Sequence, residues 1–81
     1  MKSRTTSRFD REFKKLSRVV KKAFAKQIKH LHTNVRHPSL HAKKYDEGQD
    51  IWQARVTDNV RFYFAIEDET YVLLSIEKHR D

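Results

Sequence analysis

Residues 59–64 read Asn-Val-Arg-Phe-Tyr-Phe, a stretch in which apolar residues alternate with Arg61 and Tyr63. Apolar side chains at every second position predict a β-strand that buries one face. Arg61 then lies in the middle of the opposite face of a strand that is otherwise hydrophobic. The neighbouring strands determine what surrounds this arginine.

The last third of the chain contains two more runs of this kind, so we predict three strands over residues 51–56, 60–67 and 71–78. Their predicted core rows are Trp52, Ala54 and Val56; Val60, Phe62, Phe64 and Ile66; and Val72, Leu74 and Ile76. A shift of one residue in the pairing register would move the apolar row of a strand to the other face of the sheet. The number of residues in each connecting loop, odd or even, therefore decides whether the three rows share a core.

A three-residue loop over residues 57–59 gives this parity, because it pairs Val56 with Val60. A two-residue turn would set Val56 against Arg61 instead. We therefore predict the longer loop, with Asn59 in the left-handed conformation.

The same argument predicts a three-residue loop over residues 68–70. This loop would pair Ile66 with Val72 and Phe64 with Leu74.

These registers bring polar residues together on the exposed face of the sheet. Arg55 lies directly opposite Arg61, and Glu77 lies opposite Arg61 on its other side. The predicted exposed face comprises Gln53, Arg55, Arg61, Tyr63, Ser75 and Glu77, with His79 diagonal to Arg61.

Two arginines directly opposite each other repel by a fraction of about 1 kcal/mol, so a partner is expected. Glu77 could supply it, which would make a structural ion pair between strands. Alternatively, two adjacent guanidinium groups form a fork suited to a phosphate. The residues alone leave both interpretations open.

The N-terminal part predicts a helix over residues 7–31, with Ser7 as its N-cap. A break near Ser17 would divide it into two helices packed as a hairpin. Its apolar stripe is Phe9, Phe13, Leu16, Val20, Phe24, Ile28 and Leu31. Residues 2–6 could form a short edge strand, and residues 36–50 form the longest loop. The predicted class is α+β, with a helix or helical hairpin on a small antiparallel sheet.

The 81 residues suffice for a single domain over 1–81 and contain no cysteine. Residues 1–44 hold 14 Lys and Arg and two acidic residues, whereas residues 45–81 hold four basic and nine acidic residues. This asymmetry indicates a polyanionic partner, either nucleic acid or an acidic protein, unless it is only a solvated helix face. We expect no signal peptide and no membrane partner, and the lack of cysteine fits the cytoplasm.

The histidines divide by position. His30 and His32 lie near the predicted helix end and are expected to be structural. His37 and His41 lie in the long loop without the spacing of a zinc site, so we expect no metal and no cofactor. His79 could move protons beside the arginines, or it could lie in a frayed terminus.

Three further residues could contact a nucleic acid. Lys43 and Lys44 precede the first predicted strand of the C-terminal sheet and could reach a phosphate. Tyr63 could stack on a base or could simply cover the sheet.

Several segments together resemble the RelE/ParE superfamily of toxins from type II toxin–antitoxin modules. They are Pro38 to Leu40, Trp52-x-x-Arg55-Val56, Arg61 within its aromatic strand, and the closing Lys-His-Arg at 78–80. The resemblance extends over nearly the whole chain. It implies a metal-independent endoribonuclease that cuts mRNA on the ribosome, by attack of a ribose 2′-OH on the adjacent phosphate. It also implies a cognate antitoxin as protein partner.

By position, Arg61 matches the arginine that stabilises the phosphate in this family, and Arg55 matches a basic residue on the neighbouring strand. His79 matches the position of a general acid. Lys43, Lys44, Gln53, Tyr63 and Arg80 are the expected substrate-binding residues.

The likeness is incomplete at the general base. Some family members place a glutamate near the Pro-x-Leu loop, where this chain offers His37 or His41, and Glu77 is a third candidate. Several place a tyrosine after the last strand, and none occurs here before Asp81. The alternatives are a ParE-like toxin that acts on DNA gyrase without nuclease chemistry, and a nucleic-acid-binding module without toxicity.

Overall fold

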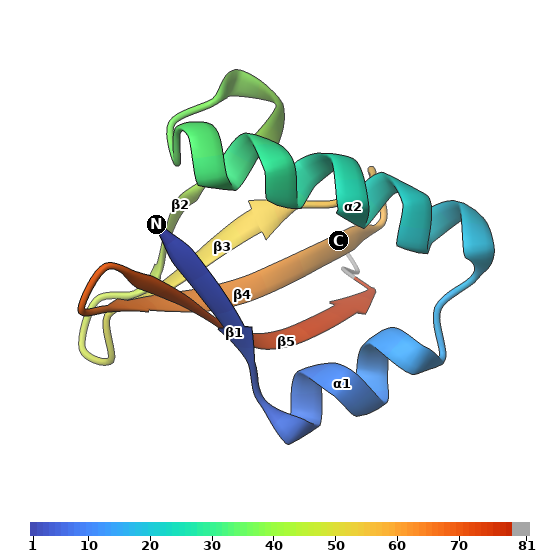
Figure 1. Ribbon diagram of the computed structural model, residues 1–81, viewed down its shortest axis with the longest axis horizontal. Coiled ribbons are helices and arrows are strands. Elements are labelled where there is room, and N and C mark those ends of the chain that lie inside the picture. The colour runs from blue at the N-terminus through green and yellow to red at the C-terminus, as the bar shows by residue number, and fades with distance from the viewer. Residues whose placement is uncertain (79–81) are drawn as a thin grey trace.

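The computed structural model describes residues 1–78 and places two helices against a five-stranded sheet (Figure 1). The elements are β1 (Lys2–Thr5), α1 (Ser7–Lys14), α2 (Arg18–Thr33), the 3-10 helix η1 (Pro38–Leu40), β2 (Lys43–Asp46), β3 (Ile51–Arg55), β4 (Val60–Glu67) and β5 (Thr70–Lys78). The strand order is β1-β5-β4-β3-β2, with β1 parallel to β5 and the other pairs antiparallel. The predicted α+β class and the edge strand at residues 2–6 are confirmed.

The predicted break in the N-terminal helix is also confirmed. Ser17 caps the second helix, because its hydroxyl accepts a hydrogen bond of 3.2 Å from the Val20 amide. The predicted cap at Ser7 is wrong, because Thr6 caps α1 by accepting from the Phe9 amide at 3.1 Å. The Thr6 hydroxyl also donates to the Leu74 carbonyl at 2.9 Å, so this contact with the sheet selects the cap.

Helix α1 lies beside the second half of β5, beyond the reach of β1 (Figure 1). There the Thr6 amide donates to the Leu73 carbonyl at 3.1 Å, and a Glu12 carboxylate oxygen accepts from the Ile76 amide at 3.1 Å. The first bond continues the pairing of β1 with β5, which ends at Leu73, and the second satisfies a backbone amide of β5 beyond the end of that pairing. They also hold Arg8 of α1 close to the sheet.

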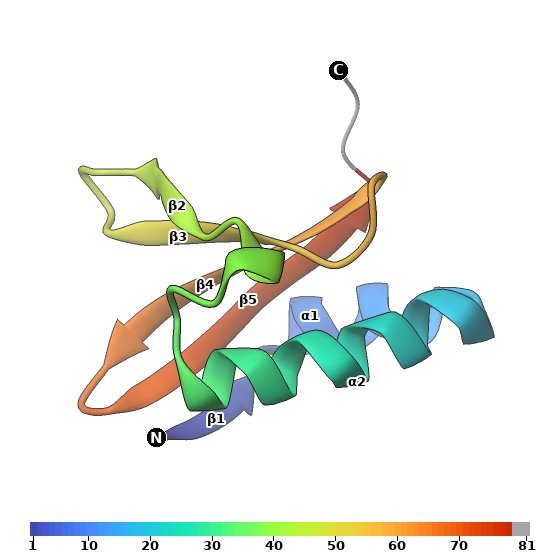
Figure 2. The same cartoon turned by 90° about the horizontal axis from the view of Figure 1, so that it is seen from above.

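Helix α2 covers one face of the sheet (Figure 2). The rings of Phe24 and Phe62 meet edge to face with centroids 5.3 Å apart, and Phe9 packs against Phe24 at 5.5 Å. The buried core is Phe9, Phe24, Leu31, Leu40, Ala54, Val56, Val60, Phe62, Phe64, Tyr71, Leu73 and Ile76. The apolar stripe predicted for the helices is confirmed. No helix within residues 1–78 is both long enough and apolar enough to cross a bilayer.

The first hairpin has the predicted register. Arg55 pairs with Arg61, and the Val56 amide donates to the Val60 carbonyl at 2.9 Å. The left-handed conformation predicted for Asn59 is wrong, because Asn59 is not among the residues with positive φ. The Thr57 amide also donates to the Val60 carbonyl, at 3.2 Å, so the loop closes without a left-handed residue.

The second hairpin differs from the prediction. Asp68 and Glu69 both have positive φ, of 46° and 62°, and form a two-residue turn in place of the predicted loop over 68–70. Such turns are preferred in hairpins because their twist matches that of the strands. Phe64 therefore pairs with Leu73 rather than Leu74, and Ile66 pairs with Tyr71 rather than Val72.

A β-bulge restores the predicted register in the other half of this hairpin. Tyr63 pairs with Ser75 and Phe64 with Leu73, so Leu74 is an extra residue on β5. The core row contains Tyr71 and Leu73 in place of the predicted Val72 and Leu74.

The predicted loop over residues 36–50 contains a strand. β2 forms an edge of the sheet and pairs with β3, with Lys43 opposite Gln53 and Lys44 opposite Trp52 (Figure 2). Its sequence, Lys-Lys-Tyr-Asp, has no apolar alternation, because neither face of this short edge strand is buried in the core.

Candidate functional site

The candidate site lies on the face of the sheet opposite α2. The register places the side chains of Arg55 and Arg61 there, on neighbouring strands and directly opposite each other. Both residues are half-buried. A firm antiparallel sheet therefore holds two guanidinium groups on one surface, as the sequence predicted.

Arg61 turns toward the loop between β3 and β4. Its Nη1 donates to the Thr57 carbonyl at 2.5 Å and to the Val60 carbonyl at 3.2 Å. Within residues 1–78, its Nε and Nη2 make no hydrogen bond. One edge of the guanidinium thus anchors the side chain, and the remaining donors are available to an anion.

Arg55 has two partners. Its Nη2 donates to an Asp58 carboxylate oxygen at 2.9 Å, and its Nη1 lies 3.4 Å from Nε2 of His41. The Asp58 side chain is 89% exposed, so water screens this ion pair strongly. His41, in contrast, is brought from the loop after η1 to within reach of an arginine of the site.

Glu77 lies opposite Arg61 in the register, as predicted. Its carboxylate forms an ion pair with Arg8 of α1 instead, with Oε2 and Nη2 3.3 Å apart. Arg8 also contacts Glu12 at 3.4 Å. Sequence reasoning missed Arg8, because nothing in the helical pattern shows that α1 runs beside β5.

Part of the face predicted to be exposed is buried. Gln53, Tyr63 and Ser75 are at most 9% exposed. Gln53 donates to the Tyr63 hydroxyl at 3.1 Å, and the ring of Tyr45 on β2 packs edge to face on Tyr63, with centroids 4.9 Å apart. Sequence reasoning missed Tyr45, because β2 was not recognised as a strand.

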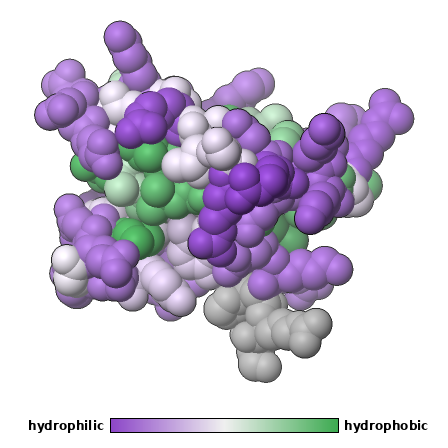
Figure 3. All heavy atoms as spheres, turned by 90° about the horizontal axis from the view of Figure 1, so that it is seen from below, coloured by the Kyte–Doolittle hydropathy of each residue, from purple (hydrophilic) through white to green (hydrophobic). Residues whose placement is uncertain are grey.

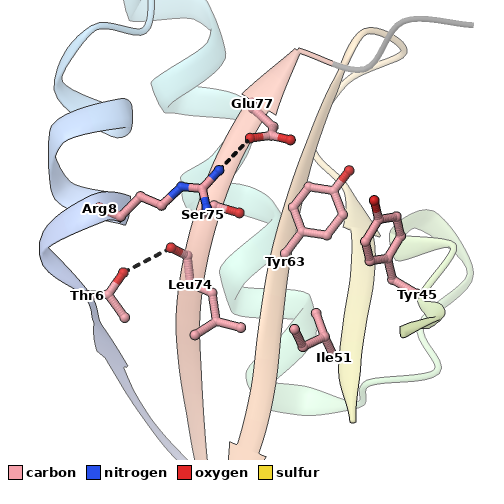
Figure 4. A pocket seen from close by; sticks show the side chains of 8 residues that line it. All are labelled: Thr6, Arg8, Tyr45, Ile51, Tyr63, Leu74, Ser75 and Glu77. Atoms are coloured by element: carbon pink, nitrogen blue, oxygen red, sulfur yellow. Dashed lines mark hydrogen bonds and ion pairs between the residues drawn. The ribbon is translucent and has the colours of Figure 1, made fainter. Parts of the chain in front are cut away.

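A pocket of about 500 Å³ lies on this face between α1 and β2 (Figure 4). Its lining residues are Thr6, Arg8, Tyr45, Ile51, Tyr63, Leu74, Ser75 and Glu77. Arg8 reaches over β5 to Glu77 at one end, whereas Ile51 and Leu74 lie toward the other end (Figure 4). The pocket therefore has one charged end and one apolar end.

The surface seen from below is mostly hydrophilic (Figure 3). Hydrophobic side chains gather in the left half of this view, bordered by hydrophilic ones (Figure 3).

Within residues 1–78, no cluster of three or more His, Cys, Asp or Glu side chains could hold a metal ion.

The remaining candidates are distributed as follows. Lys43 pairs in register with Gln53 and is exposed. Lys44 binds Asp50 and lies over the ring of Trp52 at 5.2 Å, and its hydrogen bond to Asp50 raises the pKa of Lys44. His79 and Arg80 lie outside the described residues.

His37 is engaged at the end of α2. Its ring stacks on that of His30, with centroids 3.8 Å apart, and its Nδ1 accepts from the Ser39 amide at 3.2 Å. Of the two loop histidines, His41 is the one that contacts Arg55.

No family model matches the sequence, and no curated protein matches it. Solved structures match closely. The YoeB/ParE toxin from Agrobacterium tumefaciens superposes with a TM-score of 0.82 at 12% identity, covering 99% of this chain and 100% of that chain. A chain of the archaeal RelE-RelB complex from Pyrococcus horikoshii OT3 superposes with a TM-score of 0.78 at 15% identity, covering 95% of this chain and 92% of that chain.

A chain of the intact E. coli RelBE toxin-antitoxin complex superposes with a TM-score of 0.75 at 17% identity, covering 99% of this chain and 98% of that chain. At such low identity, the shared property is the fold. These matches confirm the structural resemblance expected from the sequence. Over nearly its whole length, the chain has the fold of the RelE, YoeB and ParE toxins.

Proposed function

We propose that this protein is the toxin of a type II toxin–antitoxin module, and that it cleaves mRNA on the ribosome without a metal ion. In this proposal residues 1–81 form one toxin domain that acts in the cytoplasm, where translation takes place. The observation that carries the proposal is the pair of opposed arginines, Arg55 and Arg61, on a toxin-like fold.

The arginines bind the scissile phosphate in this proposal. Arg61 offers Nε and Nη2, which bind no other residue in the described part of the chain. Arg55 can exchange its exposed partner Asp58 for a phosphate oxygen. Two guanidinium groups stabilise the additional negative charge that develops on the phosphate oxygens in the transition state.

The reaction needs one proton acceptor and one proton donor. The base removes the proton from the ribose 2′-OH, whose oxygen attacks phosphorus and displaces the 5′-oxygen, leaving a cyclic phosphate. The acid gives its proton to that leaving oxygen. We assign the base to His41, because it contacts Arg55, and the acid to His79 on the strength of the resemblance.

His37 and Glu77 are weaker candidates for the base, because each is engaged elsewhere. His37 binds Ser39 and stacks on His30, and Glu77 pairs with Arg8. Lys43 and Arg80 remain proposed contacts for the RNA, whereas Tyr63 is buried under Tyr45 and Lys44 is held by Asp50. Gln53 supports Tyr63 through its hydrogen bond.

The proposed partners are the ribosome with its mRNA and a cognate antitoxin. Structural neighbours from Pyrococcus horikoshii and E. coli were solved as complexes with antitoxins. For this chain, an antitoxin that covers the arginine face would prevent access of RNA.

Induced expression in growing bacteria, with primer extension on several abundant mRNAs, tests the proposal. We expect growth arrest together with new 5′ ends at fixed positions within codons. Growth arrest with intact mRNA and accumulating DNA damage would support a ParE-like action on gyrase instead. Unchanged growth, with salt-sensitive binding to RNA in vitro, would indicate a nucleic-acid-binding module.

A further inference from the structure

Gln27 is a polar residue within the apolar side of α2, and it is 6% exposed. Its Nε2 donates to the Ser39 carbonyl at 3.0 Å and to the Arg55 carbonyl at 2.8 Å. Its Oε1 accepts from the Ser39 hydroxyl at 3.1 Å. The amide therefore uses both its donor and its acceptor capacity inside the protein.

These bonds join three elements that are far apart in the sequence. Figure 2 shows η1 between the C-terminal part of α2 and the sheet. Gln27 lies on α2, Ser39 in η1, and Arg55 at the end of β3. One side chain thus fixes η1 and the end of β3 relative to α2.

The same elements carry the proposed base and one arginine of the site. His41 ends η1 in the left-handed conformation, with φ of 47° and ψ of 41°, and its amide donates to the Pro38 carbonyl at 3.3 Å. A non-glycine residue keeps this conformation only where surrounding contacts hold it. From there its ring reaches the Arg55 guanidinium at 3.4 Å.

The contacts form a closed ring. It runs from Gln27 to Ser39, through His41 to the guanidinium of Arg55, and from the carbonyl of Arg55 back to Gln27. We propose that Gln27 is a positioning residue for the proposed nuclease, because it fixes the contact between His41 and Arg55 without touching substrate. This inference rests on the proposed function for its effect on cleavage.

Gln27→Met tests the inference, because it keeps a similar length and removes both donors. In the wild type, side-chain NMR resonances are expected to show contact between the His41 ring and the Arg55 guanidinium. In Gln27→Met this contact is expected to disappear, while contact between the rings of Phe24 and Phe62 remains as a sign of an intact core. A merely structural role would leave the contact between His41 and Arg55 unchanged.

The kinetic expectation is a loss in kcat rather than in substrate binding. A displacement of about 1 Å between reacting groups lowers rates by up to about a hundredfold. We expect kcat for mRNA cleavage to fall between about tenfold and a hundredfold, with KM within about twofold.

Two controls match this variant. Ser39→Ala keeps both bonds from Nε2 and removes only the one to Oε1, so its rate should stay within about threefold of the wild type. Val72→Ala shortens a residue that is 2% exposed and lies outside the ring of contacts, so it should lower stability but leave kcat unchanged. Should Gln27→Met fail to fold, Gln27→Asn replaces it, because the shorter amide cannot reach both carbonyl groups.

A preserved contact between His41 and Arg55 in the Gln27 variants would overturn the inference, and so would a lost contact with unchanged kcat. The NMR readout is independent of activity. If the wild type cleaves no mRNA, the proposed function fails. The positioning role of Gln27 can then still be tested by binding of inorganic phosphate, followed at the Arg55 Nε resonance. Phosphate binding that is weakened in Gln27→Met but not in Val72→Ala supports the positioning role, and equal binding by both variants contradicts it.

Discussion

Arg55 and Arg61 lie directly opposite each other on β3 and β4, and the carboxylate nearest to Arg61 in the register is paired with a different arginine. Glu77 binds Arg8 from α1, while Arg61 binds backbone carbonyls of the adjacent loop. The opposed arginines therefore keep much of their capacity to bind an anion. Within residues 1–78, Arg61 and Glu77 form no ion pair, so the structural interpretation that the sequence left open does not hold there.

Removing the exposed partner of Arg55 should favour RNA binding. In Asp58→Asn, the ion pair with Arg55 is lost and a negative charge disappears from the site. We expect unfolding free energy to change by less than about 1 kcal/mol, because the pair is exposed. RNA affinity, measured by fluorescence anisotropy at low salt, should increase several-fold. Asp10→Asn on α1 is the matched control, and weaker RNA binding by Asp58→Asn would argue against the site.

The turn between β4 and β5 should be improved by glycine. Glu69 has a φ of 62°, a conformation that disfavours residues with a Cβ by about 1–2 kcal/mol. Glycine also adds freedom to the unfolded chain, so we expect Glu69→Gly to gain about 0.5–1 kcal/mol in unfolding free energy. Urea denaturation measures this gain. Glu67→Gly, within β4, should lose stability, and a loss in both variants would contradict the assigned turn.

Glu12 should stabilise the edge of β5 through one hydrogen bond. Its carboxylate accepts from the Ile76 amide at 3.1 Å, so Glu12→Ala leaves that amide without its partner. The expected loss is about 1–2 kcal/mol of unfolding free energy. Glu12→Gln retains an oxygen that can accept, and most of the stability should remain. Equal losses in both variants, as measured by urea denaturation, would show that charge rather than the hydrogen bond matters.

Stability should fall in mild acid partly because of His30. Partial burial, the neighbouring His37 and the charge of Lys26 all lower the pKa of His30 below its ordinary value of 6.5. Well above pH 6.5 the imidazole is neutral in both folded and unfolded chains. As the pH falls below that value, the unfolded chain binds a proton first, so stability decreases until the folded pKa is reached.

Unfolding measured between about pH 7.5 and pH 5.5 should therefore show a smaller decrease in stability for His30→Gln than for the wild type. His32→Gln, on an exposed neighbour in the same helix, provides the comparison. An unchanged pH dependence in His30→Gln would remove His30 as a cause.

Hydrophobic periodicity was sufficient to predict the core face of β3, the buried Val60, Phe62 and Phe64 of β4, and the opposition of Arg55 and Arg61, but Ile66 is exposed. The apolar rows of β3 and β4 permit only one parity, and the three-residue loop between them supplies it. The turn at Asp68 and the bulge at Leu74 were not predictable in this way. The turn is one residue shorter than predicted, and the bulge adds one residue to β5. The two differences cancel, so Tyr63 still pairs with Ser75 as predicted.

Contacts across the fold explain what else the sequence concealed. The place of Arg8 depends on α1 running beside β5, and no local pattern encodes that path. Tyr45 lies on an edge strand without apolar alternation. Gln27 did leave a signal, because a polar residue interrupts the apolar side of α2, and its buried amide links Ser39 to Arg55.

The phosphate-binding role of Arg61 is tested by cleavage of ribosome-bound mRNA by purified Arg61→Ala, beside the wild type and Arg4→Ala. Arg4 is a matched arginine whose side chain is 58% exposed and pairs with Glu67 at the sheet edge. Removing a donor that stabilises transition-state charge lowers rates by about a hundredfold or more. We expect such a loss for Arg61→Ala with an unchanged fold, and wild-type cleavage by Arg4→Ala. Equal cleavage by all three proteins would contradict a phosphate site at the opposed arginines.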